Sequence, residues 1–277
     1  MRQTILLIAA LALVGCGKKT TPAEPETNAE PKAAGKKPTP PKAFTNTLGM
    51  KFVPVPGTEV AFCIWETRVK DYAAYAAANA GVDGSWKESP FFKKLGFKQE
   101  EMHPVVNVNW EDANAFCEWL TKKELAEGKI KEGQKYRLPT DAEWSVAVGL
   151  GQEKGNTPKE KHLGIKDVCP WGKGWPPPKG AGNYSELLKV DEFKDTAPVG
   201  SFAANQHGLY DLGGNALEWC EDKYSPNRSW RVLRGASFAD NARSHLWSSY
   251  RHYITPNMRI HFVFAGFRCV LVGGSGG

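Results

Sequence analysis

Three of the chain's six histidines, His245, His252 and His261, fall within one C-terminal segment. Imidazole nitrogens are common metal ligands, and three of them could hold a divalent ion. Clustering along the chain does not establish a metal site, however, because each ligand must be fixed by packing and by hydrogen bonds to its other nitrogen. The sequence predicts a surface loop here, so we treat these histidines as contact residues.

Cysteine is the second residue type that could do chemistry. Beyond Cys16 the chain has five cysteines, and no CxxC pair or Cys/His spacing typical of zinc occurs among them. An exported domain can pair cysteines in disulfides, and an odd number leaves at least one thiol without a partner in the chain. The five are Cys63, Cys117, Cys169, Cys220 and Cys269.

The histidine segment is also rich in aromatic residues and poor in ordinary surface residues. No Lys, Glu or Gln occurs between Ala236 and Ala265. The aromatic positions follow neither strict alternation nor a 3.6-residue spacing, which disfavours a core strand or helix. We interpret them as a binding surface, because aromatic residues and Arg dominate interface hot spots. The alternative is that some of them are core residues, since the chain must close near Gly266.

Three helices and several short strands must position this segment. A helix is predicted over "RVKDYAAYAAAN", a second begins at Asn109 as its N-cap, and a third begins with a capping box of Thr140 and Glu143. Short strands are predicted in "KFVPVPGTEVAFCIWET", "TAPVGSF", "RVLRGASF" and "GFRCVLV". Periodicity fades after Gly149, so the sequence predicts an α+β domain with much ordered loop.

The N-terminal region differs from the rest in composition. Residues 1–16 carry a short apolar run ending in "LVGC", which resembles a bacterial lipobox and implies lipid attachment to Cys16; an ordinary signal peptide is the alternative. Residues 17–43 have almost no large aliphatic residues and are expected to be a disordered tether. Residues 273–277 are expected to be a flexible tail.

The positive charge lies mainly in this N-terminal region. Of the formal charge of +6, residues 1–43 contribute +4, from seven Lys/Arg and three Asp/Glu, which leaves +2 for the remainder. The folded part is therefore not a basic module, and nucleic-acid binding is not expected.

Five motifs occur in an order that resembles the formylglycine-generating-enzyme (sulfatase-modifying factor) family. They are "PVVNVNWEDANAFCEWL", "YRLPTDAEWSVA", "TAPVGSFAANQHGLYDLGGNALEWCED", "VLRGASF" and "GFRCV". The resemblance implies a C-type lectin-like fold over residues 44–272, with short strands and two or three helices. It also implies a disulfide between Cys117 and Cys269, with two buried free thiols as the alternative.

The family's enzymes oxidise a sulfatase cysteine with copper-binding thiols that lie shortly after an "RGGS" motif. The matching region of this chain, "RGASFADNARSHLWSSYRHYITP", contains no cysteine. Because Cu(I) prefers soft thiolate ligands, we expect no catalytic residues, no enzymatic activity and no required cofactor. Iron chemistry of the sulfoxide-synthase kind, which shares the fold, is disfavoured because the histidines lie in a predicted loop.

The histidine segment more closely resembles the variable proteins of diversity-generating retroelements. Their framework positions match Arg234, Gly235, Ser237, Asn241, Ala242, Arg243, Ser249, Arg251, Pro256, Asn257, Arg259, Gly266, Phe267 and Arg268. The predicted ligand-binding positions between them, in a variable region of about 234–268, are Phe238, Ala239, Asp240, His245, Leu246, Trp247, Tyr250, His252, Tyr253, Met258, Ile260, His261, Phe262 and Phe264.

Adenine randomisation in these systems explains the missing residue types. A randomised AAC or AAT codon can encode many residues but never Lys, Glu or Gln, whose codons end in a purine. Randomisation of an AAC or AAT codon cannot produce Trp or Met either, so Trp247 and Met258 depart from this pattern. Ala236 is a further departure, because it replaces the usual second glycine.

The family resemblance also suggests calcium. It implies oxygen ligands at Asn183 and Asp191, with backbone carbonyls near Tyr184 and Phe193, and "GGNALEW" offers Asn215 and Glu218. The alternative is that Asn215 and Glu218 only brace the loop through hydrogen bonds.

The sequence thus predicts a lipid-anchored protein of the bacterial cell envelope, at the outer membrane and facing the exterior. Its variable region would bind protein or glycan ligands on another cell. An exported formylglycine-generating-type oxidase and a non-catalytic accessory envelope lipoprotein remain as alternatives.

Overall fold

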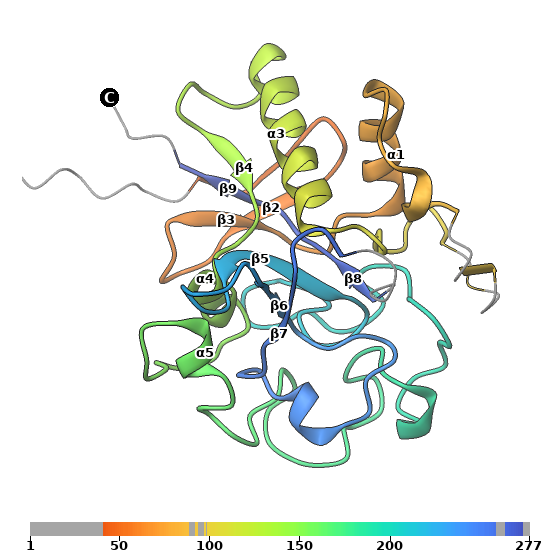
Figure 1. The fold of residues 1–277 in the computed structure, drawn as a ribbon, viewed down its shortest axis with the longest axis vertical. Helices are drawn as coiled ribbons and strands as arrows, with labels where there is room; N and C mark the ends of the chain where they lie inside the picture. Colours follow the sequence, from red (N-terminus) through yellow and green to blue (C-terminus); the bar gives the residue numbers. More distant parts are fainter. Residues whose placement is uncertain (1–40, 89–91, 94–96, 98, 259–263, 274–277) are drawn as a thin grey trace, which may run out of the picture. The chain divides into compact units, whose positions relative to one another are not determined.

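The computed structural model describes residues 41–88, 92–93, 97, 99–258 and 264–273 (Figure 1). Cys16, almost all of the expected tether and most of the expected tail lie outside this range. No helix among the described residues is both long and apolar enough to cross a bilayer.

A five-stranded antiparallel sheet joins the two ends of the domain. Its strands are β1 (Phe44–Thr45), β2 (Lys51–Pro54), β3 (Val60–Cys63), β4 (Lys135–Arg137) and β9 (Val270–Val272), in the order β1-β2-β3-β9-β4. The last strand, β9, inserts between β3 and β4, with Leu271 opposite both Ala61 and Tyr136. The C-terminal segment is therefore held at its end by the N-terminal part of the domain.

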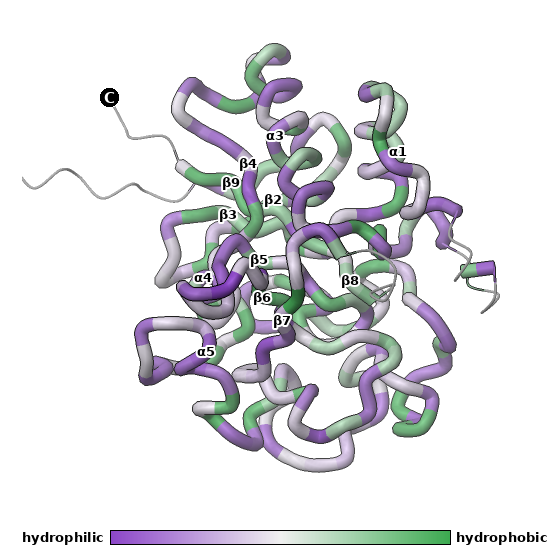
Figure 2. Tube along the Cα trace, viewed as in Figure 1, coloured by the Kyte–Doolittle hydropathy of each residue, from purple (hydrophilic) through white to green (hydrophobic). Residues whose placement is uncertain are grey.

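Two long helices cover this sheet. The helices α1 (Val69–Ala78) and α3 (Trp110–Ala126) lie side by side above the sheet in Figure 1. As predicted, Asn109 caps α3, because its side chain accepts a hydrogen bond from the Asp112 N–H at 2.8 Å. The tube of α3 alternates between hydrophobic and hydrophilic residues in Figure 2, as expected for a helix with one buried face.

Two shorter helices follow. Thr140 and Glu143 form the predicted capping box at the start of α4 (Asp141–Ala147). The one-turn helix α5 (Pro158–Lys161) was not predicted; the Thr157 side chain caps it, and Pro158 is its first residue.

A second sheet of four strands carries the histidine segment. It consists of β5 (Leu217–Lys223), β6 (Arg231–Arg234), β7 (His252–Ile254) and β8 (Ala265–Gly266), in the order β7-β6-β5-β8. The strands β5 and β8 run parallel, with Leu217 opposite Ala265, whereas the other pairs are antiparallel. The predicted strands in "RVLRGASF" and "GFRCVLV" are thus confirmed.

Ordered loops make up much of the rest, with short 3-10 helices at η1 (Gly84–Trp86), η2 (Glu186–Leu188) and η3 (Arg243–Leu246). The strand predicted in "TAPVGSF" is wrong. Its backbone N–H groups at Ala197 and Gly200 donate to the side chains of Asn215 and Asp211, and Val199 donates to the carbonyl of Met102. Side-chain acceptors therefore replace the neighbouring strand that this segment would need.

The expected disulfide between Cys117 and Cys269 is also absent. Their sulfur atoms lie 3.5 Å apart, whereas a disulfide requires about 2.05 Å. Both side chains are buried in the main core, and the Cys269 sulfur also contacts the Thr67 hydroxyl at 3.8 Å. The structure therefore has the alternative arrangement of two buried free thiols.

Candidate functional site

A buried carboxylate on α4 anchors both sides of the histidine segment. Arg234, at the end of β6, donates to the carboxylate and the carbonyl of Asp141 and to the Ser248 carbonyl at 2.7 Å. Arg251 donates from Nε and Nη2 to the two Asp141 carboxylate oxygens, each at 2.9 Å, and also pairs with Glu153. Neither arginine has any exposed surface, so these two framework positions fix the segment to the scaffold.

The Asp141 carboxyl is correspondingly stabilised in its charged form. Burial alone would raise its pKa, but the adjacent guanidinium groups of Arg234 and Arg251 outweigh burial and hold the pKa below its ordinary value. The framework thus depends on a carboxylate that stays ionised at neutral pH.

A third buried framework arginine pairs with one of the predicted calcium residues. Arg268 is fully buried and forms several hydrogen bonds with Glu218, between 2.6 and 2.9 Å long, and Trp144 donates to the same carboxylate. The side-chain oxygen of Asn215 already accepts from Ala197 and Asn183. Glu218 and Asn215 therefore make the bracing hydrogen bonds that were the alternative to calcium binding.

The other two predicted calcium residues, Asn183 and Asp191, offer oxygen donors. The Oδ1 atom of Asn183 is buried and accepts no hydrogen bond within the described part of the chain. The Asp191 carboxylate accepts the N–H groups of Tyr184, the residue after Asn183, and of Phe193, both at 2.9 Å. An unpaired amide oxygen and a carboxylate are hard donors of the kind that calcium prefers.

The predicted ligand-binding positions divide by exposure. Ala239, Tyr253 and Met258 are exposed. Tyr253 stacks on Tyr224 and Trp230, with ring centroids 3.9 and 5.1 Å apart, so one exposed aromatic side chain rests on a rigid aromatic support. The half-buried positions are Asp240, His245, Trp247, Tyr250, His252 and Phe264. Three further predicted positions, Ile260, His261 and Phe262, lie outside the described residues.

Two predicted contact residues are core residues instead. Phe238 is 6% exposed and packs against Phe97 and the half-buried Phe264. Leu246 is 2% exposed and packs with Tyr184 and neighbouring apolar side chains. Phe238 lies in a turn and Leu246 in the one-turn 3-10 helix η3, which are too short for burial to leave a periodic signal in the sequence.

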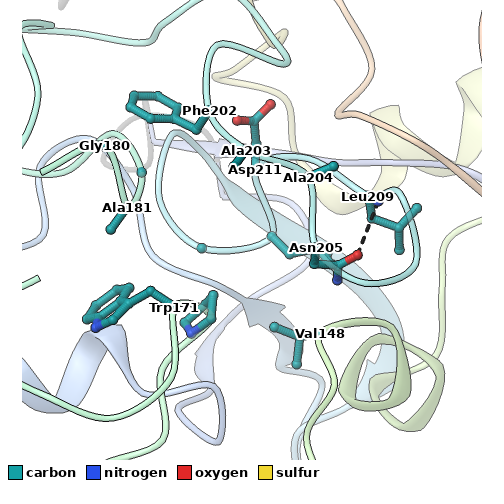
Figure 3. A pocket seen from close by; sticks show the side chains of 14 residues that line it. Val148, Trp171, Gly180, Ala181, Phe202, Ala203, Ala204, Asn205, Leu209 and Asp211 are labelled. Carbon is teal, nitrogen blue, oxygen red and sulfur yellow. Dashed lines mark hydrogen bonds between the residues drawn. The ribbon is translucent and has the colours of Figure 1, made fainter. Parts of the chain in front are cut away.

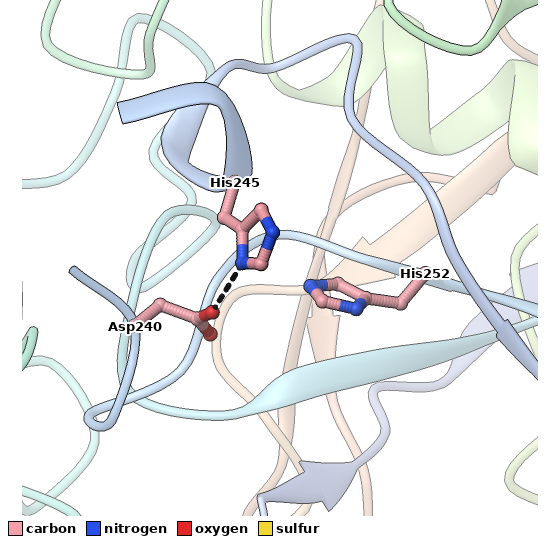
Figure 4. Close-up of side chains that lie close together, drawn as sticks. All are labelled: Asp240, His245 and His252. Carbon is pink, nitrogen blue, oxygen red and sulfur yellow. Dashed lines mark hydrogen bonds and ion pairs between the residues drawn. The ribbon is translucent and has the colours of Figure 1, made fainter. Parts of the chain in front are cut away.

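The fold brings two of the histidines together with an aspartate. Asp240 lies in the turn after β6, His245 is in η3, and His252 begins β7. One ligand atom from each residue lies within 4.8 Å of the other two, and His245 Nδ1 lies 3.0 Å from Asp240 Oδ1 (Figure 4). This grouping was not predicted, although an acidic residue among the histidines was visible in the sequence.

Burial sets the charge of this cluster. Burial lowers the pKa of His252 to about 4, against a raising effect of Asp240, so its imidazole is neutral at pH 7. Burial raises the pKa of Asp240, but hydrogen bonds from His245 and Ser237 outweigh it and leave the pKa below its ordinary value. A carboxylate thus faces a neutral imidazole.

A cavity of about 220 Å³ lies in the loop region away from this cluster (Figure 3). Trp171, Phe202, Leu209 and Asp211 are among the side chains that line it. Burial raises the pKa of Asp211 to about 6, and its Oδ1 atom has no partner within the described residues. No sequence pattern predicts this cavity, because its walls come from separate loops.

Few helices, short strands and ordered loops around buried arginine–carboxylate pairs define an α+β domain of the formylglycine-generating-enzyme type. The chain belongs to the sulfatase-modifying factor enzyme 1-like domain family, which matches residues 17–272.

Relatives in this family include both inactive and active proteins. The chain is 33% identical over 167 residues to inactive C-alpha-formylglycine-generating enzyme 2 of Bos taurus, covering 58% of this chain and 47% of the relative. It is 34% identical over 151 residues to formylglycine-generating enzyme of Thermomonospora curvata, covering 52% of this chain and 41% of the relative. The chain therefore spans less than half the length of these relatives.

The fold is also that of a variable protein. Treponema denticola variable protein 1 superposes with a TM-score of 0.53 at 20% identity, covering 84% of this chain and 99% of that protein. At this identity the similarity establishes the shared fold.

Proposed function

We propose that the protein is a surface-displayed lipoprotein whose variable region, residues 234–268, binds ligands of varying identity. The observation that carries the proposal is the contrast within this region. Arg234, Arg251 and Arg268 are fully buried and paired with carboxylates, whereas Tyr253 and Met258 between them are exposed. Side chains on a rigid frame can change without loss of the fold, which is the requirement for a diversified binding surface.

The binding surface we propose is smaller than the sequence predicted. It is centred on Ala239, Tyr253 and Met258 and excludes the buried Phe238 and Leu246. The stack of Tyr253 on Tyr224 and Trp230 favours ligands with flat apolar faces, either a glycan ring or an aromatic side chain of a protein.

Anchoring and calcium belong to the same proposal. Lipid attachment at Cys16 would hold the domain at the envelope, and the tether would let the surface reach a partner on another cell. Calcium bound by Asn183 and Asp191 would order the loop between residues 183 and 195; the unpaired Asn183 Oδ1 supports this.

We do not propose the family's copper-dependent oxidation for this chain. Four of the five described cysteines have a raised thiol pKa, caused first by burial, and all five are buried, so no exposed thiolate pair exists among the described residues. The five described cysteines therefore offer Cu(I) no accessible thiolate ligand.

Two matched libraries test the proposal. One randomises the exposed positions Ala239, Tyr253 and Met258, and the other randomises the buried positions Arg234, Phe238 and Arg251. We expect most members of the first library to fold and to yield binders to unrelated protein and glycan targets, and most members of the second to unfold. Equal loss of folding in both libraries would contradict the proposal.

A fixed accessory role is the second candidate. The ring of Tyr250 packs on those of His245 and His252, with centroids 4.5 and 4.6 Å apart. Such mutual packing favours one defined local structure, as a constant partner would require. This reading predicts a sequence that does not vary between copies of the gene.

A further inference from the structure

Asp240, His245 and His252 form a cluster that the proposed function does not use. The three come from different elements, namely a turn, a 3-10 helix and a strand, and Figure 4 shows a ring nitrogen of His252 directed toward the other two side chains. It is the single group of three or more His, Cys, Asp or Glu residues with metal-binding spacing among the described residues.

The donors are held in place by their surroundings. Ser237 donates to the Oδ2 atom of Asp240 from its backbone N–H at 2.8 Å and from its hydroxyl at 2.7 Å, which leaves Oδ1 directed at His245. Tyr250 packs against both imidazole rings. Hydrogen bonds and packing that orient a donor are what a metal ligand needs from its neighbours.

One donor of the cluster lacks a partner. The Nε2 atom of His252 is buried and forms no hydrogen bond within the described part of the chain. An unpaired polar atom in the interior is destabilising, and a bound ion is one way to satisfy it. A ring nitrogen without a hydrogen-bond partner can offer its lone pair to a metal.

We propose that Asp240, His245 and His252 bind a divalent transition-metal ion, with Zn²⁺ and Fe²⁺ as the best matches. Two imidazoles and one carboxylate form the ligand set of open zinc sites and of non-haem iron sites, in which the remaining positions stay free for water or another ligand. His245 is 34% exposed at its side chain, which gives the ion a route from solvent.

The distances allow the site to close with small movements. With metal–ligand bonds of about 2.1 Å, neighbouring donors lie roughly 3–3.5 Å apart. Asp240 Oδ1 and His245 Nδ1 already lie 3.0 Å apart, and the third donor lies within 4.8 Å. Metal binding would replace the hydrogen bond between these two atoms.

The kind of donor atom distinguishes this site from the proposed calcium site. Nitrogen donors favour transition metals, whereas Ca²⁺ prefers oxygen ligands alone. The inference does not depend on the proposed function, because a fixed surface could hold the ion equally well.

Titration of the untagged full chain with Co²⁺ tests the site, with Zn²⁺ as a competitor. We expect one Co²⁺ per chain, with visible absorption bands that Zn²⁺ abolishes. Asp240→Asn and His245→Asn should each weaken binding by about 100-fold or more, beyond the usual loss for a residue outside the first ligand shell. His207→Asn removes a histidine outside the cluster and should leave affinity unchanged.

A folding control and two possible outcomes decide the test. His245 is partly exposed, so His245→Asn should fold even if a change at the more buried His252 does not, and thermal unfolding of the metal-free variants checks this. Stoichiometry far below one Co²⁺ per chain would overturn the inference. So would equal affinity in the Asp240→Asn and His245→Asn variants, which would place the ion elsewhere.

Discussion

Arg251 and Asp141 are separated by 110 positions in the chain, yet they form a two-point ion pair in the interior, with both hydrogen bonds 2.9 Å long. The pair ties the strand that carries His252 to the start of α4. Because Arg234 shares the same carboxylate, Asp141 fixes the histidine segment from both sides.

Replacement of Asp141 by asparagine should therefore destabilise the whole domain. The substitution keeps the shape of the side chain but leaves two buried guanidinium groups without its charge. Breaking a buried ion pair in this way costs about 3–5 kcal/mol. Chemical denaturation measures the loss, and the exposed Glu132→Gln should change stability by no more than about 0.5 kcal/mol. A similar small effect of Asp141→Asn would show that the segment is held by other contacts.

Two substitutions of matched size should separate core from surface in the variable region. Leu246→Ala removes a buried side chain and should cost about 2–5 kcal/mol. Met258→Ala removes an exposed side chain and should cost no more than about 0.5 kcal/mol. Denaturation of both variants measures the difference, and similar losses would argue against an exposed binding surface at Met258.

The sequence predicted local features of the fold better than it predicted burial and contacts between distant residues. The caps at Asn109 and Thr140 could be predicted because capping depends on residues three positions apart. The framework arginines could be predicted from the family resemblance, but their carboxylate partners lie far away in the chain. Periodicity misplaced Phe238 and Leu246, because it reports burial only in regular helices and strands.

The cluster of Asp240, His245 and His252 could not be predicted from the sequence for a related reason. Its three residues meet only because η3 folds back between β6 and β7. Spacing along a loop does not reveal such a meeting, whereas spacing along a helix would.

His252 should make the domain less stable in acid. Its folded-state pKa is about 4, whereas an exposed histidine has a pKa of 6.5. The unfolded chain therefore binds a proton more readily, and folding stability falls as pH drops from 6.5 through 4, by about 3 kcal/mol in total.

The metal-free His252→Gln variant should lack this part of the acid sensitivity. Unfolding free energies measured in a chelator at pH 7 and pH 4 give the comparison, since a bound metal would compete with the proton. An unchanged pH dependence in the variant would mean that His252 is not buried in neutral form.

Calcium should stabilise the loop that contains Asn183 and Asp191. Binding to the folded state alone adds about 2.7 kcal/mol at a calcium concentration 100 times the Kd. We expect calcium to raise the Tm of the chelator-treated protein and Asp191→Asn to remove that increase, whereas the exposed neighbour Glu192→Gln retains it. An equal rise in Tm for Asp191→Asn would exclude Asp191 as a ligand.

Sequencing the 3′ end of the gene in many cells of one culture tests the binding proposal most directly. We expect substitutions at adenine-matched codons for exposed positions such as Ala239 and Tyr253, an almost identical template repeat nearby, and invariant codons for Arg234 and Arg251. A single constant sequence without a template repeat would contradict a diversified surface and leave the fixed accessory role.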